Sequence, residues 1–118
     1  MSELAIDPIR SPERCYRIDS FTVPDAAREA FVATMQRNLA FIRTLDGFRG
    51  HTVFEKRDGD SSFNLVTIAA WEDRAALERA KDEVRAYLQR SGLDLPGMLR
   101  AWGVRLVRAD YSAPAGLQ

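Results

Sequence analysis

The sequence predicts one α+β domain whose elements follow the order β-α-β-β-α-β. The strongest evidence is the segment 63–71, FNLVTIAAW, in which side chains alternate as they do along a strand. Both of its faces are mostly apolar, so we expect this strand to be covered on both sides. Two segments with the apolar spacing of helices flank the hairpin that contains it. A chain of 118 residues has the length of one domain.

Composition narrows the possible functions. The formal net charge is zero, which argues against a general nucleic-acid binder. The single cysteine excludes an intramolecular disulfide and a cysteine-based metal site. No apolar run approaches the roughly 20 residues that cross a bilayer, and the first residues lack the pattern of a signal peptide. We therefore expect a cytoplasmic protein that binds neither nucleic acid nor a membrane.

The N-terminal part divides into an arm and a strand. Residues 1–14 carry two prolines and no apolar periodicity, which predicts a flexible arm before a domain over 15–112. Residues 15–23 read as the first strand, and Arg17 and Asp19 fall on its otherwise core-like face. These charges lie either at a wet edge of the sheet, which the rarity of buried charges favours, or in a cavity, where Asp19 would bind a substrate.

A helix is predicted over 25–45, where Asp46-Gly47 ends it. Apolar residues recur along it at steps of three and four: Ala27, Phe31, Met35, Leu39, Ile42 and Leu45. Asn38 lies near the middle of this stripe, and a buried amide without a partner costs about 1–3 kcal/mol. The more common outcome is an Asn satisfied by backbone or water; the alternative is an amide that lines a pocket.

The rest of the chain completes the predicted order of elements. It comprises a strand over 51–55, a hairpin turn over 57–61, the strand over 63–71, a helix over 73–90 in one piece or two, a short helix within 95–103, a strand over 103–112 and a frayed tail over 113–118. His51, the only histidine, is interpreted as a half-exposed strand residue in preference to a site residue.

This order is the split βαβ, or ferredoxin-like, plan: one four-stranded antiparallel sheet with both helices on one face. Val66 and Ile68 belong to the face that the helices leave bare. A bare apolar face of this size needs a cover, and a second copy of the sheet is the simplest one. We therefore expect a symmetric homodimer. Thr67, Ala69 and Trp71 belong to the opposite face, beneath the helices, where we expect a pocket.

Two runs, LDGFRGHTVFEKRDG and AAWEDRAALERA, resemble the antibiotic biosynthesis monooxygenase (ABM) domain, a dimeric α/β-barrel family with the ferredoxin-like plan. The resemblance covers roughly residues 15–111. It implies oxidation of a small electron-rich aromatic or polyketide-like substrate, a quinol or an anthrone, by O₂ without a metal, flavin or other cofactor. The chemical reason is that an electron-rich phenolate can itself reduce oxygen, so the protein needs only an apolar pocket and groups that stabilise the anion.

The resemblance also assigns site residues. Trp71 and Arg85 match the family's tryptophan and helix arginine, which implies catalytic roles as pocket wall and anion stabiliser. Thr67 stands where the family has an asparagine, and Leu77 stands where it has an aromatic residue; both are expected to contact substrate. Asn38 could restore a polar group from the opposite wall. The structural alternative is that Trp71 only fills the core and that Arg85 is solvated beside an acidic neighbour.

Two further functions belong to the same fold. The haem-degrading branch uses an asparagine on the first strand and a histidine on the second helix; here the strand position is Asp19 and the helix has no histidine, so haem is not expected. The alternative to an enzyme is a non-catalytic dimeric protein that binds a small ligand, such as a stress-response protein.

Overall fold

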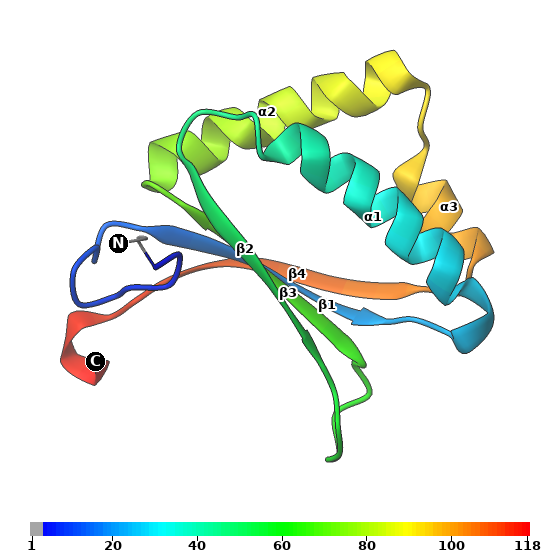
Figure 1. The fold of residues 1–118 in the computed structure, drawn as a ribbon, viewed down its shortest axis with the longest axis horizontal. Coiled ribbons are helices and arrows are strands. Elements are labelled where there is room, and N and C mark those ends of the chain that lie inside the picture. Colours follow the sequence, from blue (N-terminus) through cyan, green and yellow to red (C-terminus); the bar gives the residue numbers. More distant parts are fainter. Residues whose placement is uncertain (1–3) are drawn as a thin grey trace.

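The computed structural model describes residues 4–118 and contains a four-stranded antiparallel sheet with its helices on one face (Figure 1). The elements are β1 (Cys15–Thr22), the 3₁₀ turn η1 (Asp25–Ala27), α1 (Arg28–Ile42), β2 (Phe48–Glu55), β3 (Leu65–Trp71), α2 (Arg74–Ser91), α3 (Leu95–Ala101), β4 (Arg105–Ser112) and η2 (Ala115–Leu117). The strand order is β2-β3-β1-β4. The predicted ferredoxin-like α+β fold is confirmed.

β1 is a central strand, so the edge prediction for its two charges is wrong. Asp19 pairs with Thr67 of β3 on one side and with Arg108 of β4 on the other. Because side chains alternate, Arg17 and Asp19 point to the same side as Phe21, toward the helices. The charges are tolerated there because basic and acidic groups from β4 lie beside them.

The core lies at the end of the sheet where α1 begins and β4 starts. Phe21 is 1% exposed and meets the ring of Phe31 on α1 edge-on, with 5.0 Å between centroids. The buried residues of this cluster come from strands, helices and loops: Phe21, Val23, Phe31, Leu65, Leu99 and Val104. A second, smaller cluster of Trp71, Leu77 and Ala80 packs against residues at the end of α1.

The helix boundaries follow local sequence signals. α1 is shorter than the predicted 25–45, because its first turn is the 3₁₀ turn η1. Gly47 has the left-handed conformation that the sequence predicts, with φ of +84°, and a Cβ there would lie 2.5 Å from the Cβ of Ala76. α2 is one continuous helix. The carboxylate of Asp73 caps it by accepting a hydrogen bond of 2.8 Å from the backbone N–H of Ala76.

β2 begins at Phe48 and contains a bulge. Phe48 pairs with Trp71, but the pairing shifts by one residue before Gly50, so that His51 pairs with Ala69. Gly50 has φ of +153°, which a larger residue rarely adopts. The extra residue changes the alternation of the strand. As a result His51 and Val53 point to the helix side, as Phe48 does.

The opposite face of the sheet is partly open. It carries apolar residues of all strands, among them Phe54, Val66, Ile68, Val107 and Tyr111, of which Val107 and Tyr111 are each 53% exposed.

Residues 4–14 form turns against the start of β1. The backbone N–H of Asp7 donates to the hydroxyl of Tyr16, and the buried guanidinium of Arg14 donates to the carbonyls of Leu4 and Ala5. For residues 1–3 the predicted flexible arm lies outside the described residues. Within 4–118 no helix is long and apolar enough to cross a membrane.

Candidate functional site

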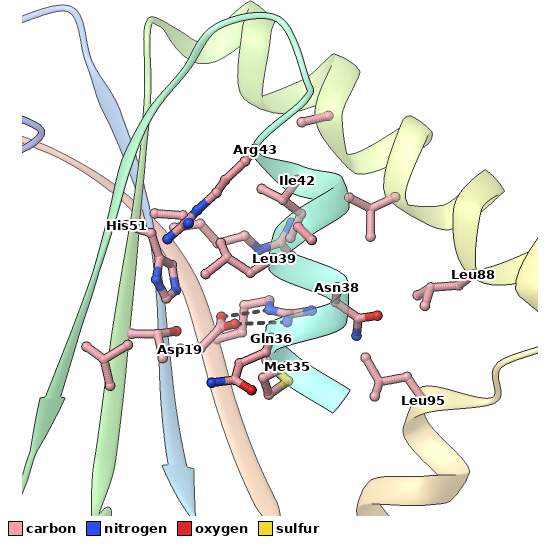
Figure 2. A pocket seen from close by; sticks show the side chains of 18 of the residues that line it. Asp19, Met35, Gln36, Asn38, Leu39, Ile42, Arg43, His51, Leu88 and Leu95 are labelled. Atoms are coloured by element: carbon pink, nitrogen blue, oxygen red, sulfur yellow. Dashed lines mark hydrogen bonds and ion pairs between the residues drawn. The ribbon is translucent and has the colours of Figure 1, made fainter. Parts of the chain in front are cut away.

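A cavity of about 940 Å³ lies between the sheet and the helices (Figure 2). It occupies the space that the core cluster leaves open under α1 and α2. All six residues that the sequence predicts for the site line this cavity: Asp19, Asn38, Thr67, Trp71, Leu77 and Arg85. The fold therefore brings the predicted set together from two strands and two helices.

β3 supplies the middle of the cavity floor. Its helix-side residues Leu65, Thr67, Ala69 and Trp71 all line the space. Thr67 and Ala69 are small, which leaves room in front of the indole. Trp71 itself is 3% exposed and packs with Leu77 and Ala80, with the ring of Phe48 edge-on at 5.4 Å between centroids. Trp71 is therefore both a core residue and a wall of the cavity.

A salt bridge joins β1 to β4 at the floor. The Nε and Nη2 of Arg108 donate to the two carboxylate oxygens of Asp19 at 2.7 and 3.0 Å. This hydrogen bonding raises the pKa of Arg108. Asp19 was predicted to bind a substrate; it does line the cavity, but both of its oxygens are engaged by Arg108. Its geometry suits a residue that positions the guanidinium.

Arg17 lies beside this pair and has weaker partners. Its Nε is 3.7 Å from Oδ1 of Asp110, while Oδ2 of Asp110 accepts a hydrogen bond of 2.6 Å from Lys81. The Nε of Arg17 is buried and donates no hydrogen bond to any described residue. Burial lowers the pKa of Arg17, and the like charge of Arg108 lowers it further. This donor is therefore enclosed by protein atoms and has no partner among the described residues.

His51 is half-buried and lines the cavity from β2. Arg43 reaches from the end of α1 toward its ring (Figure 2). Burial lowers the pKa of His51, and the positive charge of Arg43 lowers it further, although Asp19 acts in the opposite direction. The imidazole is therefore neutral at pH 7 and has a lone pair that can accept a proton.

Asn38 is 7% exposed and points from α1 toward Leu88 and Leu95 (Figure 2). Its Oδ1 is buried and accepts no hydrogen bond from the described residues. The interpretation in which protein backbone satisfies this oxygen is therefore wrong for Oδ1. The structure favours the interpretation as an amide that lines a pocket.

Arg85 stands at the rim of the cavity. Its side chain is 68% exposed, and its Nη1 donates to Oδ1 of Asp82 at 3.1 Å on the same helix. This is the solvated arrangement that the sequence offered as the structural alternative. The assignment of Arg85 as an anion-stabilising residue stays a prediction.

Sequence reasoning did not select four of the polar residues that line the cavity: Arg17, Arg43, His51 and Arg108. The alternation of Arg17, Asp19 and Phe21 on one strand face was an available signal for Arg17. Arg43 follows Leu39 by four residues, which placed it on the same side of the helix. For Arg108 no local signal exists, because its partner is 89 residues away in the chain.

The arrangement can hold a flat apolar molecule, accept a proton and stabilise negative charge. The walls are apolar, with one neutral imidazole and several guanidinium groups at defined places. Across residues 4–118 no group of three His, Cys, Asp or Glu side chains is placed to hold a metal ion.

Several solved structures have the same fold. One is SnoaB from Streptomyces nogalater, described as a cofactor-independent oxygenase: it is 27% identical, with a TM-score of 0.64 over 86% of this chain and 94% of that one. A proposed monooxygenase from Shewanella loihica is 19% identical, with a TM-score of 0.66 over 86% of this chain and 94% of that one. A proposed antibiotic biosynthesis monooxygenase from Nitrosomonas europaea is 13% identical, with a TM-score of 0.63 over 88% of this chain and 93% of that one.

A search of curated proteins finds no match. The sequence model of antibiotic biosynthesis monooxygenase matches residues 16–90, from the second residue of β1 to near the end of α2. This range includes the strand with Trp71 and most of the cavity floor. The match confirms the resemblance read from the sequence, and the chain belongs to the antibiotic biosynthesis monooxygenase family.

Proposed function

We propose that this protein is a cofactor-independent monooxygenase that oxidises a small electron-rich aromatic, of the quinol or anthrone type, with O₂. The observation that carries the proposal is the cavity of about 940 Å³ with Trp71 and Leu77 in its wall and Thr67 and Asn38 as polar groups. Cavities of about 300–1,000 Å³ hold ligands of this size. The likeness to SnoaB, described as a cofactor-independent oxygenase and 27% identical, supports the absence of a cofactor.

The reaction needs a base and a place for the anion. Neutral His51 accepts a proton from the substrate, and Arg43 beside it stabilises the negative charge that forms. The substrate anion gives one electron to O₂, and the two radicals combine to a peroxide on carbon. His51 returns its proton to the peroxide, and loss of water from the resulting hydroperoxide leaves a carbonyl group. One oxygen atom enters the product, and the other leaves as water with both hydrogens of the former methylene.

The other site residues hold the substrate. The indole of Trp71 stacks on the aromatic rings, and Leu77 closes the same wall. The hydroxyl of Thr67 and the amide of Asn38 form hydrogen bonds at the two sides. Arg85 reaches an anion at the rim only by leaving Asp82.

We further propose that the protein is a homodimer through the open sheet face. Phe54, Val107 and Tyr111 each leave more than half of their surface exposed there. Exposed apolar groups that gather on one sheet face are typical of an interaction surface. A second copy of this face presents a matching apolar surface, as isologous contacts in symmetric dimers require.

Oxygen consumption with dithranol, a dihydroxyanthrone, tests the proposed reaction. We expect one O₂ consumed for each 1,8-dihydroxyanthraquinone formed, at a rate well above that of heat-denatured protein, and unchanged by a chelator. Catalase should return no oxygen, because the second oxygen atom leaves as water. Trp71→Phe and Arg85→Ala test the two assigned residues, with Arg37→Met on the exposed side of α1 as control. If the protein binds 1,8-dihydroxyanthraquinone but consumes no oxygen with dithranol, the result favours the non-catalytic ligand binder instead.

A further inference from the structure

The N-terminal segment, residues 4–14, covers one end of the sheet face that the helices leave bare (Figure 1). The backbone N–H of Asp7 donates a hydrogen bond of 3.3 Å to the hydroxyl of Tyr16 on β1. Tyr16 and Gly50 both lie opposite Ala70 of β3, one from each side. Because side chains alternate along strands, all three positions belong to the open face. The segment therefore lies on the other side of the sheet from the cavity.

Ala5 of this segment packs directly on Gly50 of β2. A Cβ at Gly50 would lie 2.5 Å from the Cβ of Ala5 and 3.7 Å from its Cα, and the first distance is shorter than two Cβ atoms tolerate. The methyl group of Ala5 thus fills the place of the side chain that Gly50 lacks. Gly50 has φ of +153°, so the same residue provides both the unusual backbone of the bulge and the room for the segment.

Arg14 holds Ala5 in this place. Its guanidinium donates hydrogen bonds to the carbonyl oxygens of Leu4 and Ala5, the second at 2.9 Å. Arg14 is 2% exposed, which is rare for an arginine and requires that its donors be paired inside the protein. The buried end of Arg14 therefore fixes the backbone on both sides of the peptide bond between Leu4 and Ala5.

β2 depends on such a contact more than the inner strands do. It is an edge strand, and β3 is its one neighbour in the sheet. Pairing register is weakly specified where a strand contains glycine and has a partner on one side only. Gly50 and His51 are consecutive and point to opposite faces, so a contact that fixes Gly50 on the open face also fixes His51 toward the cavity.

We propose that Arg14 and Ala5 are positioning residues for His51. Arg14 holds the N-terminal segment on Gly50, and the seated segment keeps β2 in the bulged pairing that directs the imidazole into the cavity. Neither Arg14 nor Ala5 lines the cavity, so both act through the sheet from its other face. The catalytic meaning of this inference rests on the proposed function, in which His51 accepts the proton of the substrate.

Arg14→Met in the full chain tests the inference, because it removes the bonds to Leu4 and Ala5 and keeps an unbranched side chain. Trypsin should then cut after the exposed Arg10 several times faster, which shows that the segment is released. An NMR titration should show that the pKa of His51 rises toward its ordinary 6.5. The reason is that the ring leaves the burial and the nearby Arg43 that lower its pKa, effects that outweigh the opposite influence of Asp19.

The kinetics of dithranol oxidation supply a second measurement. We expect kcat of Arg14→Met to fall at least about tenfold, since positioned proton transfer contributes more than this to a rate. The affinity for 1,8-dihydroxyanthraquinone should stay within about twofold, because Trp71, Leu77 and Thr67 still form the substrate walls. Glu13→Met is the matched control: Glu13 is the exposed neighbour of Arg14, and its replacement should change neither the pKa of His51 nor kcat.

Ala5→Leu gives an independent test that leaves Arg14 in place. The larger side chain has no room against Gly50, so it lifts the segment and should change the pKa of His51 and kcat in the same direction as Arg14→Met. This variant also keeps the inference testable if Arg14→Met does not fold. Melting temperatures by circular dichroism show which variants are folded.

The outcomes separate the two proposals. Faster cleavage after Arg10 with an unchanged pKa of His51 would overturn the inference, because the segment then only stabilises the fold. Unchanged cleavage in Arg14→Met would overturn it as well, since Arg14 would not hold the segment. A raised pKa of His51 in the variants, with no oxygen consumption by the wild-type protein, supports the positioning and removes the enzyme. Oxidation of dithranol with equal kcat in all variants leaves the proposed function standing and overturns the inference.

Discussion

Asp19 on β1 and Arg108 on β4 form a two-pronged salt bridge at the floor of the cavity, with hydrogen bonds of 2.7 and 3.0 Å. The side chain of Asp19 is 11% exposed and that of Arg108 is 39% exposed. Both carboxylate oxygens are used, so the pair ties the central strand β1 to the edge strand β4 and fixes a cation at the edge of the site.

Asp19→Asn should destabilise the protein, because it removes the charge and leaves Arg108 without its partner. Hydrogen bonds to charged groups contribute about 1.5–3 kcal/mol, and partial exposure of Arg108 brings the expected loss to about 1–2 kcal/mol. Urea denaturation measures the free energy of unfolding. Asp82→Asn, which breaks the exposed pair with Arg85, is the control and should change it by less than about 0.5 kcal/mol. Equal effects of the two substitutions would contradict this account.

His51 should titrate below its ordinary pKa of about 6.5. Burial lowers the pKa of His51, and Arg43 lowers it further, so Arg43→Met should raise the value toward normal without reaching it. His51 is the only histidine, so its signals in an NMR titration need no assignment by mutation. A midpoint at or above 6.5 would show that the ring is solvated and would remove it as the neutral base.

The same shift predicts how stability depends on pH. Because folding lowers the pKa of His51, the unfolded chain binds more protons in the window between the lowered value and about 6.5. The free energy of unfolding therefore falls as pH decreases through this window, and His51 has no effect at higher pH. His51→Gln should remove this part of the pH dependence and leave the rest of the curve in place.

Ala69→Phe should block the cavity, because Ala69 stands on the floor next to Trp71 and its small side chain leaves the space open. We expect the affinity for 1,8-dihydroxyanthraquinone to fall at least tenfold while the melting temperature changes by only a few degrees, since the new ring enters empty space. Ala33→Phe on the exposed side of α1 is the control for added bulk. Unchanged binding in Ala69→Phe would move the ligand to another place.

Val107→Glu should convert the proposed dimer into monomers, since it places a charge on the open sheet face at a position that is 53% exposed. Sedimentation velocity at micromolar concentration measures the mass. Val53→Glu is a matched control: Val53 is also 53% exposed, but it lies on the helix side of the sheet. A monomeric wild-type protein, or equal effects of both substitutions, would contradict an interface on this face.

The fold was predictable because it is encoded in local patterns. The two apolar faces of the segment that became β3, the spacing along the two helices and the glycine at position 47 each depend on residues close in sequence. The pocket between the helices and the strand face of Thr67, Ala69 and Trp71 was predicted from the alternation of side chains along that strand. These are features that periodicity and turn chemistry determine.

The polar part of the site was less predictable because its partners are distant in sequence. The charges of Arg17 and Asp19 argued against an interior position in the sequence alone. In the fold, Asp110 and Arg108 of β4 lie beside them and supply opposite charges. His51 was interpreted as a strand residue without a role, since the direction of its side chain depends on an irregular pairing near Gly50. A lone glycine inside a strand pattern is a known sign of a bulge, and it was the one local indication available.

The bulge before Gly50 has a consequence for how this family can diversify. If the same residues paired without the bulge, His51 would lie opposite Ile68, so that His51 and Val53 would turn to the open face and Thr52 and Phe54 would turn to the ligand. An imidazole would be replaced by a hydroxyl and a phenyl ring with no substitution anywhere in the strand. A shift of one residue in the pairing of β2 with β3 can therefore alter the chemistry of this site as much as several point mutations.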